Sequence, residues 1–338
     1  MADKNLATLI VFDIYHGMED VEPGSIKYIR VNEQIPRPWG ARRFWDGDVY
    51  DQQHACISKD TNLGLRVQHG IVPVYKDGSA HFVVPADRNI FFQALDENYM
   101  EVQRERTFVN YLPGETRTCI GCHETPKDAP IGRKKMVEAL KHAPDKPGPQ
   151  PGEKTGTRTL DYARDVQPIL DKHCVKCHTG EKPKAGLNLS GRMTTLFNKS
   201  YENLIPERRK GTGRRSFDLV GPTIGENHPK TGNVHYLPTK SLGSHASVLV
   251  AMLNPDKVKL KNPKMAEIAD KLAKKHKKIK LSKQEMVRLT TWVDANGQYY
   301  GSYYGRKNLK YKDHPNFRPD STYEQAASLL PPIKEEDR

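Results

Sequence analysis

The sequence of 338 residues predicts an α+β fold, in which an N-terminal antiparallel β-sandwich-like domain precedes a mainly helical domain. Residues 1–141 contain short β-prone runs separated by Gly and Pro, without a long helical period. Residues 142–157, HAPDKPGPQPGEKTGT, have the composition of a linker and mark the expected domain boundary. Residues 158–305 carry helical periodicity with capping residues, and residues 306–338 are expected to form an extended tail.

Two segments of the first half predict paired strands. Residues 70–84, GIVPVYKDGSAHFVV, contain two β-rich runs around Asp77-Gly78, which is a signal of a β-hairpin. Residues 89–112 give two further strands around the sequence DEN. These runs predict a small antiparallel sandwich that ends near residue 118. The alternative is a β region that belongs to a larger assembly.

The helical half is expected to begin with a short helix and to end with a longer one. Asp165 is expected to cap the first helix, and Pro168 falls in its first turn, where a missing N–H does no harm. The closing helix begins at a capping box formed by Ser282 and Glu285. Its apolar stripe packs against the first helix, and Asn296-Gly297 ends it. The expected apolar faces are Val166, Ile169 and Leu170 in the first helix, and Met286, Leu289, Trp292 and Val293 in the closing helix.

Two C-x-x-C-H motifs dominate the sequence, in residues 116–125, TRTCIGCHET, and residues 171–180, DKHCVKCHTG. They use four of the five cysteines, and chance predicts roughly 0.003 such motifs in a chain of this composition. The first motif consists of Cys119, Cys122 and His123, and the second consists of Cys174, Cys177 and His178.

This spacing is typical of covalent c-type haem attachment. Two cysteines three positions apart can bond two vinyl groups on one edge of the macrocycle, and the next residue can then bind the iron. A zinc site made of four thiolates would leave both histidines unexplained, and a thioredoxin-like dithiol needs no histidine directly after it. The sequence therefore predicts two haem c groups, with His123 and His178 as proximal iron ligands.

The distal ligand of the second haem is expected between its motif and the closing helix. His276 and His245 are the two candidate histidines, and Met252 and Met265 are the alternatives. Two histidine ligands would give a low reduction potential, and a methionine would raise it.

The first haem has no such candidate after its motif. His54, His69 and His81 lie upstream, and an open sixth position that binds small ligands is an alternative to all three. Cys56, the fifth cysteine, is interpreted as a structural thiol or as a metal ligand together with His54.

The charge and the apolar content of the sequence limit the kinds of partner and location that we expect. The net charge is +13, and the lysines concentrate in residues 254–283, so we expect a basic face that steers an acidic redox partner rather than nucleic acid. No run of about 18 apolar residues is present, so no membrane span is expected. The N-terminus does not resemble a secretory signal, although c-type haem is attached after export. We therefore expect an extracytoplasmic protein that derives from a longer exported precursor.

Three stretches, residues 67–100, 111–124 and 160–180, resemble the α subunit of hydrazine synthase and related haem proteins. The resemblance extends from about residue 7 to about residue 305. It implies a middle domain with one c-type haem and a C-terminal domain with a second, bis-histidine haem. It also implies an extracytoplasmic location in the periplasm or in the anammoxosome, and other redox subunits as partners. In that family a β-propeller precedes both domains, and this sequence does not contain it.

The resemblance also implies roles for two positions of the first motif. In the family, the motif histidine that matches His123 binds zinc, and a tyrosine four residues further on binds the iron. Lys127 stands at that tyrosine position here. This departure favours ordinary iron ligation by His123, or a different chemistry.

Three functions fit these observations. The first is a dihaem c-type cytochrome that transfers electrons within a redox complex of nitrogen metabolism. The second is a redox enzyme subunit with small nitrogen-species chemistry at the first haem, where Asp128 is a candidate group. The third is a structural or sensor haem subunit.

Overall fold

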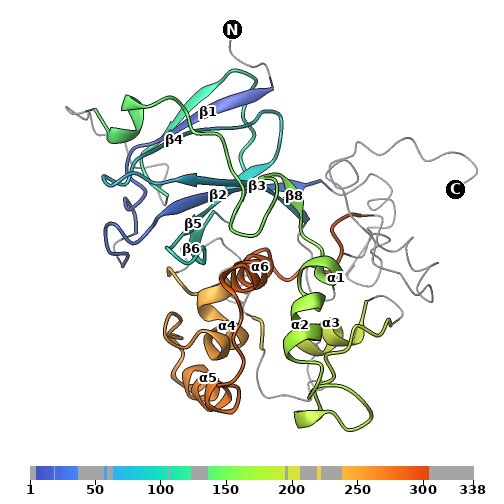
Figure 1. The fold of residues 1–338 in the computed structure, drawn as a ribbon. Helices are drawn as coiled ribbons and strands as arrows, with labels where there is room; N and C mark the ends of the chain where they lie inside the picture. The colour runs from blue at the N-terminus through green and yellow to red at the C-terminus, as the bar shows by residue number, and fades with distance from the viewer. Residues whose placement is uncertain are drawn as a thin grey trace, which may run out of the picture.

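A computed structural model gives the fold of the chain, in which two β-sheets and a group of helices form three layers (Figure 1). The five-stranded sheet lies between the three-stranded sheet and the helices. The mixed α+β content that the sequence predicts is confirmed. The structure describes residues 5–18, 20–36, 57–58, 64–105, 107–122, 136–194, 197–205, 219–221 and 238–303.

The three-stranded sheet has the strand order β4-β1-β7. β1 pairs antiparallel with β4 but parallel with β7, so the expectation of a purely antiparallel sandwich is wrong at this edge. Parallel pairing needs a long crossover connection, and most of the first half of the chain lies between β1 and β7. The three strands are β1 (Leu6–Val11), β4 (Ala80–Pro85) and β7 (Thr116–Cys119).

The five-stranded sheet is antiparallel throughout and has the order β6-β5-β2-β3-β8. β5 and β6, which are joined through the sequence DEN and pair antiparallel, confirm the two strands predicted around it. The strands are β2 (Tyr28–Ile35), β3 (Leu65–Pro73), β5 (Ile90–Leu95), β6 (Glu101–Arg104) and β8 (Arg158–Thr159).

The predicted hairpin around Asp77-Gly78 is wrong. The chain does turn there, because Gly78 adopts a φ of 82° and Tyr75 N–H bonds to the carbonyl of Ser79 at 2.9 Å. The two strands that flank the turn nevertheless enter different sheets. β3 is already bonded on both sides, to β2 and β8, so β4 pairs with β1 instead.

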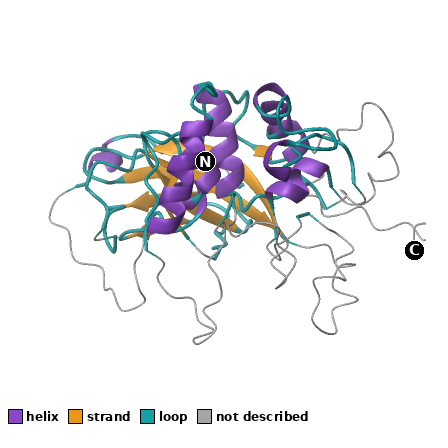
Figure 2. Cartoon of the chain, turned by 90° about the horizontal axis from the view of Figure 1, so that it is seen from below, coloured by secondary structure: helices purple, strands orange, loops and turns teal. Residues whose placement is uncertain are grey.

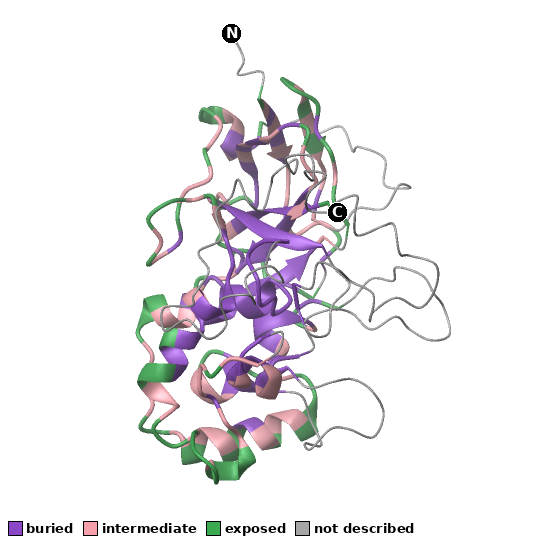
Figure 3. Cartoon of the chain, turned by 90° about the vertical axis from the view of Figure 1, so that its right-hand side faces the viewer, coloured by how far each residue is buried: buried purple, intermediate pink, exposed green. Residues whose placement is uncertain are grey.

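The space between the two sheets holds the core of the first half. β2 contributes side chains to two layers, because successive side chains of a strand point to opposite faces of the sheet. Ile29 and Val31 enter this core, whereas Arg30 reaches the helical layer on the other face. Figure 3 shows the strands of the middle layer as largely buried. Further members of this core are Leu9, Val11, Ile14, Phe82, Val84, Ile90, Phe92, Ala94 and Val102.

The second half is built from short helices that lie along one side of the five-stranded sheet (Figure 2). Three short 3₁₀ helices, η3 (Glu138–Lys141), η4 (Lys184–Gly186) and η5 (Gly243–Ala246), connect or precede other elements. No helix in the described ranges is long and apolar enough to cross a membrane. The α-helices are α1 (Tyr162–Asp165), α2 (Gln167–His173), α3 (Lys199–Leu204), α4 (Val248–Leu253), α5 (Pro263–Lys275) and α6 (Lys283–Asp294).

The capping predictions have mixed outcomes. The capping box of Ser282 and Glu285 at the start of α6 is confirmed, with both of its reciprocal bonds present. Asp165 does not cap α2, because it is the last residue of α1 and its carboxylate accepts the N–H of Asp161 at 2.8 Å. Asp161 is the residue that caps α1, through the N–H of Arg164. Pro168 lies in the first turn of α2 as expected.

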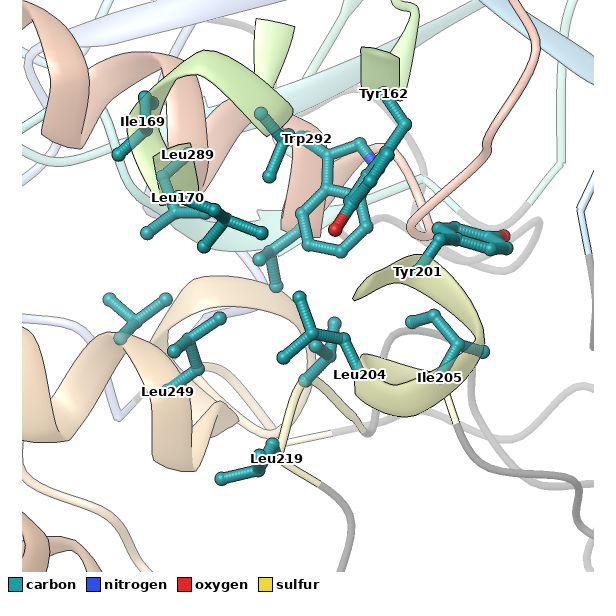
Figure 4. Close-up of a cluster of buried hydrophobic side chains, with 14 of the residues drawn as sticks. Tyr162, Ile169, Leu170, Tyr201, Leu204, Ile205, Leu219, Leu249, Leu289 and Trp292 are labelled. Carbon is teal, nitrogen blue, oxygen red and sulfur yellow. The ribbon is translucent and has the colours of Figure 1, made fainter. Parts of the chain in front are cut away.

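An aromatic cluster forms the centre of the helical core (Figure 4). Trp292 of α6 is fully buried, and its ring centroid lies 5.2 Å from that of Tyr162 and 6.4 Å from that of Tyr201. Its indole N–H donates to the carbonyl of Gln298 at 2.8 Å. The closing helix therefore packs against the first helix, as the apolar stripe predicts.

A buried polar network joins the sheet to α6. Arg30 on β2 lies 3.5 Å from the carboxylate of Asp294, and both side chains are 1% exposed or less. The same guanidinium donates to Gln93 at 3.0 Å and to Gln150 at 2.8 Å. A buried charge is tolerated only when it is paired and hydrogen-bonded, so this network fixes the orientation of the two halves.

Candidate functional site

The second motif follows the C-terminus of α2. Ile169 and Leu170 of that helix are buried in the helical core, and this packing fixes where the next turn emerges. Cys174 is half-buried against the core, while Cys177 is exposed on the surface. The motif therefore has one edge anchored in the core and one edge open to solvent.

The histidine of this motif faces a second histidine from a distant part of the chain. The ring centroids of His178 and His276 lie 6.1 Å apart, and the two planes differ by 17°. His276 is the residue at which α5 ends. Sequence analysis named it as one of two candidate distal ligands, and the structure brings this candidate to the motif.

Both imidazoles are oriented by backbone carbonyl groups. Nδ1 of His178 lies 3.1 Å from the carbonyl oxygens of Lys184 and Leu187, and Nδ1 of His276 lies 2.8 Å from that of Leu272. Because a carbonyl oxygen only accepts, Nδ1 carries the proton in each ring. Nε2 is then the unprotonated nitrogen, which is the arrangement that metal-binding histidines require.

This geometry fits a bis-histidine iron site. An imidazole nitrogen binds a first-row metal at about 2.0 Å and lies about 1.1 Å from its own ring centroid, so two ligands on one iron have centroids about 6 Å apart. The measured separation of 6.1 Å agrees with that value. The residues present therefore suit a c-type haem, which Cys174 and Cys177 would hold covalently and His178 and His276 would ligate.

The competing interpretations of the cysteines fit less well. The four motif cysteines are free thiols, and no three His, Cys, Asp or Glu side chains of the described residues gather as a metal cluster would require. Burial raises the pKa of Cys174 to about 11, with a further contribution from Cys177. A redox dithiol works through a lowered thiol pKa, so this pair is poorly suited to disulfide exchange.

The other candidate histidine of the second site contacts the sheet half. Nε2 of His245 is 3.0 Å from the carboxylate of Asp96, and the histidine side chain is 6% exposed. The nitrogen that would bind iron thus already has a hydrogen-bond partner. Met252 and Met265 are partly buried and pack against the same core cluster as Cys174.

The first motif begins on a strand. Cys119 ends β7, and Cys122 follows after a turn. Both thiols line a small cavity of about 30 Å³ that is partly open to solvent. Its walls are mainly apolar side chains from both sheets, and burial raises the pKa of Cys122 well above its usual range. The remaining lining residues are Val11, Ile14, Ile29, Phe82, Phe92, Ala94, Glu105 and Gly121.

Glu105 and Gly121 are two residues of this cavity that sequence analysis missed. Glu105 places the one carboxylate of the lining beside the two cysteines, and it accepts the N–H of Phe92 at 2.9 Å. Gly121 lies so close to His16 that an added Cβ would overlap the backbone there. Gly121 lies within the motif itself, but its close approach to His16 and the position of Glu105 depend on tertiary contacts that no local sequence signal reports.

Several candidates of the first site lie outside the described residues. They include the motif histidine His123 and the position Lys127, together with Asp128, His54 and Cys56. Of the upstream histidines, His69 places Nε2 2.8 Å from the buried carboxylate of Glu33. His81 places Nδ1 3.1 Å from the carbonyl oxygen of His142. His69 thus has its Nε2 engaged by an acidic partner, as His245 has.

Comparison with known proteins gives a consistent result. Residues 24–124 match the family model of the hydrazine synthase alpha subunit middle domain. Hydrazine synthase subunit alpha of Kuenenia stuttgartiensis is 24% identical to this chain, over 85% of the chain and 38% of that protein.

The solved structure of Kuenenia stuttgartiensis hydrazine synthase has the same fold as this chain. It aligns with a TM-score of 0.59 at 22% sequence identity, over 87% of this chain and 43% of that one. The chain therefore spans less than half the length of either relative. The three findings agree: residues 24–124 match the middle domain of the hydrazine synthase alpha subunit, and the chain is similar to that subunit over 85% of its own length.

Proposed function

We propose that this protein is a dihaem c-type subunit that transfers electrons within a redox complex of nitrogen metabolism. The observation that carries this proposal is the pair of His178 and His276, with ring centroids 6.1 Å apart beside Cys174 and Cys177. Two histidine ligands close both axial positions of an iron, so the second site suits electron transfer rather than substrate binding. Haem bound there would supply one-electron redox chemistry.

The first site takes the other haem. Cys119 and Cys122 line an apolar cavity between the sheets, which suits the apolar edge of a macrocycle. In this proposal the motif histidine His123 binds the iron, because Lys127 stands where the related enzymes have tyrosine. A zinc ion near His123 would be an alternative use of that residue.

The relationship to hydrazine synthase supports a place in a multi-subunit complex. The partners in this proposal are other redox subunits, and the compartment is extracytoplasmic, as for an anammoxosome enzyme. The proposed domains remain those of the sequence, with the first haem in residues 1–141 and the second in residues 158–305.

A redox enzyme is the second candidate function. Glu105 favours it, because a carboxylate in a mainly apolar cavity beside Cys119 and Cys122 is a group that can hold or deliver a proton. In that case the first site would bind a small nitrogen species and the second site would feed electrons to it.

Carbon monoxide binding distinguishes the two functions. CO binds ferrous haem only where the sixth position is free or easily displaced, so the dithionite-reduced, haem-loaded protein is examined by its Soret band before and after CO is added. We expect no CO shift from the second haem. His276→Ala should create one, whereas His245→Ala should not. A CO shift in the unaltered protein that becomes larger in His276→Ala assigns an open iron to the first site and favours the enzyme.

Absence of covalent haem in either motif would overturn the proposal. A pyridine haemochrome assay on the whole protein, on Cys119→Ser/Cys122→Ser and on Cys174→Ser/Cys177→Ser measures this directly. We expect each double variant to keep about half of the covalent haem. Equal haem content in all three proteins would contradict the assignment of one haem to each motif.

A further inference from the structure

We propose that the surface around His178 and His276 docks a small acidic one-electron redox protein. The docking surface consists of exposed lysines from the two segments that carry these histidines, and we call it the lysine patch. The inference rests on the proposed function, since it names the partner of the second site. The members of the lysine patch are Lys176, Lys182, Lys184, Lys274, Lys275, Lys277, Lys278 and Lys280.

The two segments are brought together by the histidine pair itself. The lysines occur in residues 174–184 and 271–280, and the 6.1 Å separation of the two imidazoles places these segments side by side. The carbonyl of Lys184 also accepts from Nδ1 of His178 at 3.1 Å. Figure 1 shows both segments at the end of the molecule farthest from the three-stranded sheet.

The two patch segments have a strong excess of basic over acidic residues. Glu181 is the one acidic residue in the two segments, whereas the whole chain has 54 basic and 41 acidic residues. Within the described part of the chain, no carboxylate lies within ion-pair distance of any patch lysine, although the neighbouring Lys271 pairs with Glu267 at 2.6 Å. The charge is therefore available to an external partner.

The exposed side of the second site lies within this patch. Cys177 is exposed, and Lys176 precedes it directly in the chain. A partner that neutralises the lysines would therefore approach the edge that holds the cofactor. Electron transfer benefits from this arrangement because electrostatic steering raises the rate of productive encounter.

Lysine chemistry favours a transient protein partner. Lysine is depleted at the cores of stable interfaces, so a face made of lysines suits a short-lived electrostatic complex. Single-stranded nucleic acid would need exposed aromatic rings for base stacking. The large exposed hydrophobic residues of the described ranges are Phe108, Leu112 and Met136, and none of them lies in the two patch segments.

The probe for the test is a plant-type [2Fe–2S] ferredoxin, a small acidic protein whose low potential allows it to reduce a bis-histidine haem. Stopped-flow absorption measures the second-order rate constant for reduction of the haem-loaded protein at about 10 mM and about 150 mM ionic strength. Isothermal titration calorimetry with oxidised ferredoxin measures binding without electron transfer.

Charge reversal tests the patch directly. Lys277→Glu/Lys278→Glu/Lys280→Glu lies beyond the last residue of α5 and should lower the rate constant at least about tenfold at low salt, with a smaller effect at about 150 mM. The matched control, Lys27→Glu/Lys76→Glu/Lys146→Glu, changes the net charge equally on exposed lysines of the sheet half. We expect this control to lose less than about threefold. The corresponding triple Gln variant should fall between the unaltered protein and the Glu variant.

The experiments can contradict the docking surface without contradicting the proposed function, and the reverse. Equal losses in the patch and control variants, or no loss in either, would overturn the docking surface. Tighter binding of single-stranded DNA or anionic vesicles than of ferredoxin at about 150 mM salt would also overturn it. If the second motif holds no haem, the proposed function fails, while calorimetry still decides whether the lysines bind an acidic protein.

Discussion

The two C-x-x-C-H motifs are alike in sequence but differ in the elements that carry them and in their surroundings. The first begins on β7, and its two cysteines line a mainly apolar cavity between sheets. The second follows α2 at the surface, faces the imidazole of His276 and is surrounded by exposed lysines. The same five-residue signature thus occurs in a site enclosed by core residues and in a site open to partners.

In the proposed function, the motif specifies attachment and the surroundings decide use. At the second site, His276 lies opposite His178 and would close the axial position of a haem iron, and exposed lysines occur beside both histidines. At the first site, the strands supply a cavity and one carboxylate, Glu105. A haem held in the first site would be suited to interact with small molecules, and a haem held in the second site would be suited to exchange electrons with proteins.

The largest expected effect comes from the core beneath the second site. Trp292→Ala should lower the free energy of unfolding by about 3–5 kcal/mol, because it removes a fully buried indole and leaves a cavity next to Tyr162 and Tyr201. Urea unfolding followed by far-UV circular dichroism measures the change. Trp292→Phe, which keeps an aromatic ring, should recover a large part of the loss. A cost below about 1 kcal/mol for the alanine variant would mean that the helices do not depend on this cluster.

The two motifs should also respond differently to substitutions between their cysteines. Gly121→Ala should destabilise the protein by about 1–3 kcal/mol and reduce haem attachment at the first motif, because its Cβ would overlap the backbone of His16. Lys176→Ala, the corresponding change in the second motif, removes an exposed side chain and should cost less than about 0.5 kcal/mol. Thermal unfolding and haem quantification of both variants make this comparison. Equal effects would contradict the difference in enclosure.

Local signals in the sequence predicted the parts of the fold that depend on neighbours in the chain. The capping box of Ser282 and Glu285, the strand pair around DEN and the apolar stripe of α6 all arise within a few residues. The hairpin around Asp77-Gly78 failed because the turn signal does not say which sheet each strand enters. Asp165 failed as a cap because Asp161, four residues earlier, already caps the preceding helix.

The residues of the candidate sites also divide into those that a local motif predicts and those that depend on tertiary structure. The cysteines and His178 follow from a local motif, whereas the choice between His276 and His245 depends on tertiary structure. Nε2 of His245 is hydrogen-bonded to the carboxylate of Asp96, which lies 149 positions earlier in the chain. No sequence pattern links those two residues. The pairing of β5 and β6 in the five-stranded sheet brings Glu105 to the first site. The C-x-x-C-H motif does not predict this pairing either.

The smallest expected effect concerns the ionic anchor of α2 at the second site. Glu285 lies 2.8 Å from Lys172 and 3.1 Å from His173, at the C-terminus of the helix that leads to Cys174. The hydrogen bond from Lys172, with others from the capping box and His173, lowers the pKa of Glu285 to about 2. Glu285→Gln keeps an acceptor for the box but removes the charge, so it should cost only about 0.5–1 kcal/mol at neutral pH.

The pH dependence gives this anchor a distinct signature. Because the folded-state pKa lies below the unfolded-state value of 4.5, the carboxylate stabilises the fold above about pH 4.5 and loses that contribution as the pH falls towards about 2. The difference in Tm between the unaltered protein and Glu285→Gln should therefore shrink over this interval. Arg117→Gln, which breaks the exposed pair of Arg117 and Glu115 on β7 near the first motif, is the matched control and should show a smaller difference at pH 7. A Tm difference for Glu285→Gln that stays constant from pH 7 to pH 2 would mean that α2 is held by its apolar face alone, as β7 is held by its sheet.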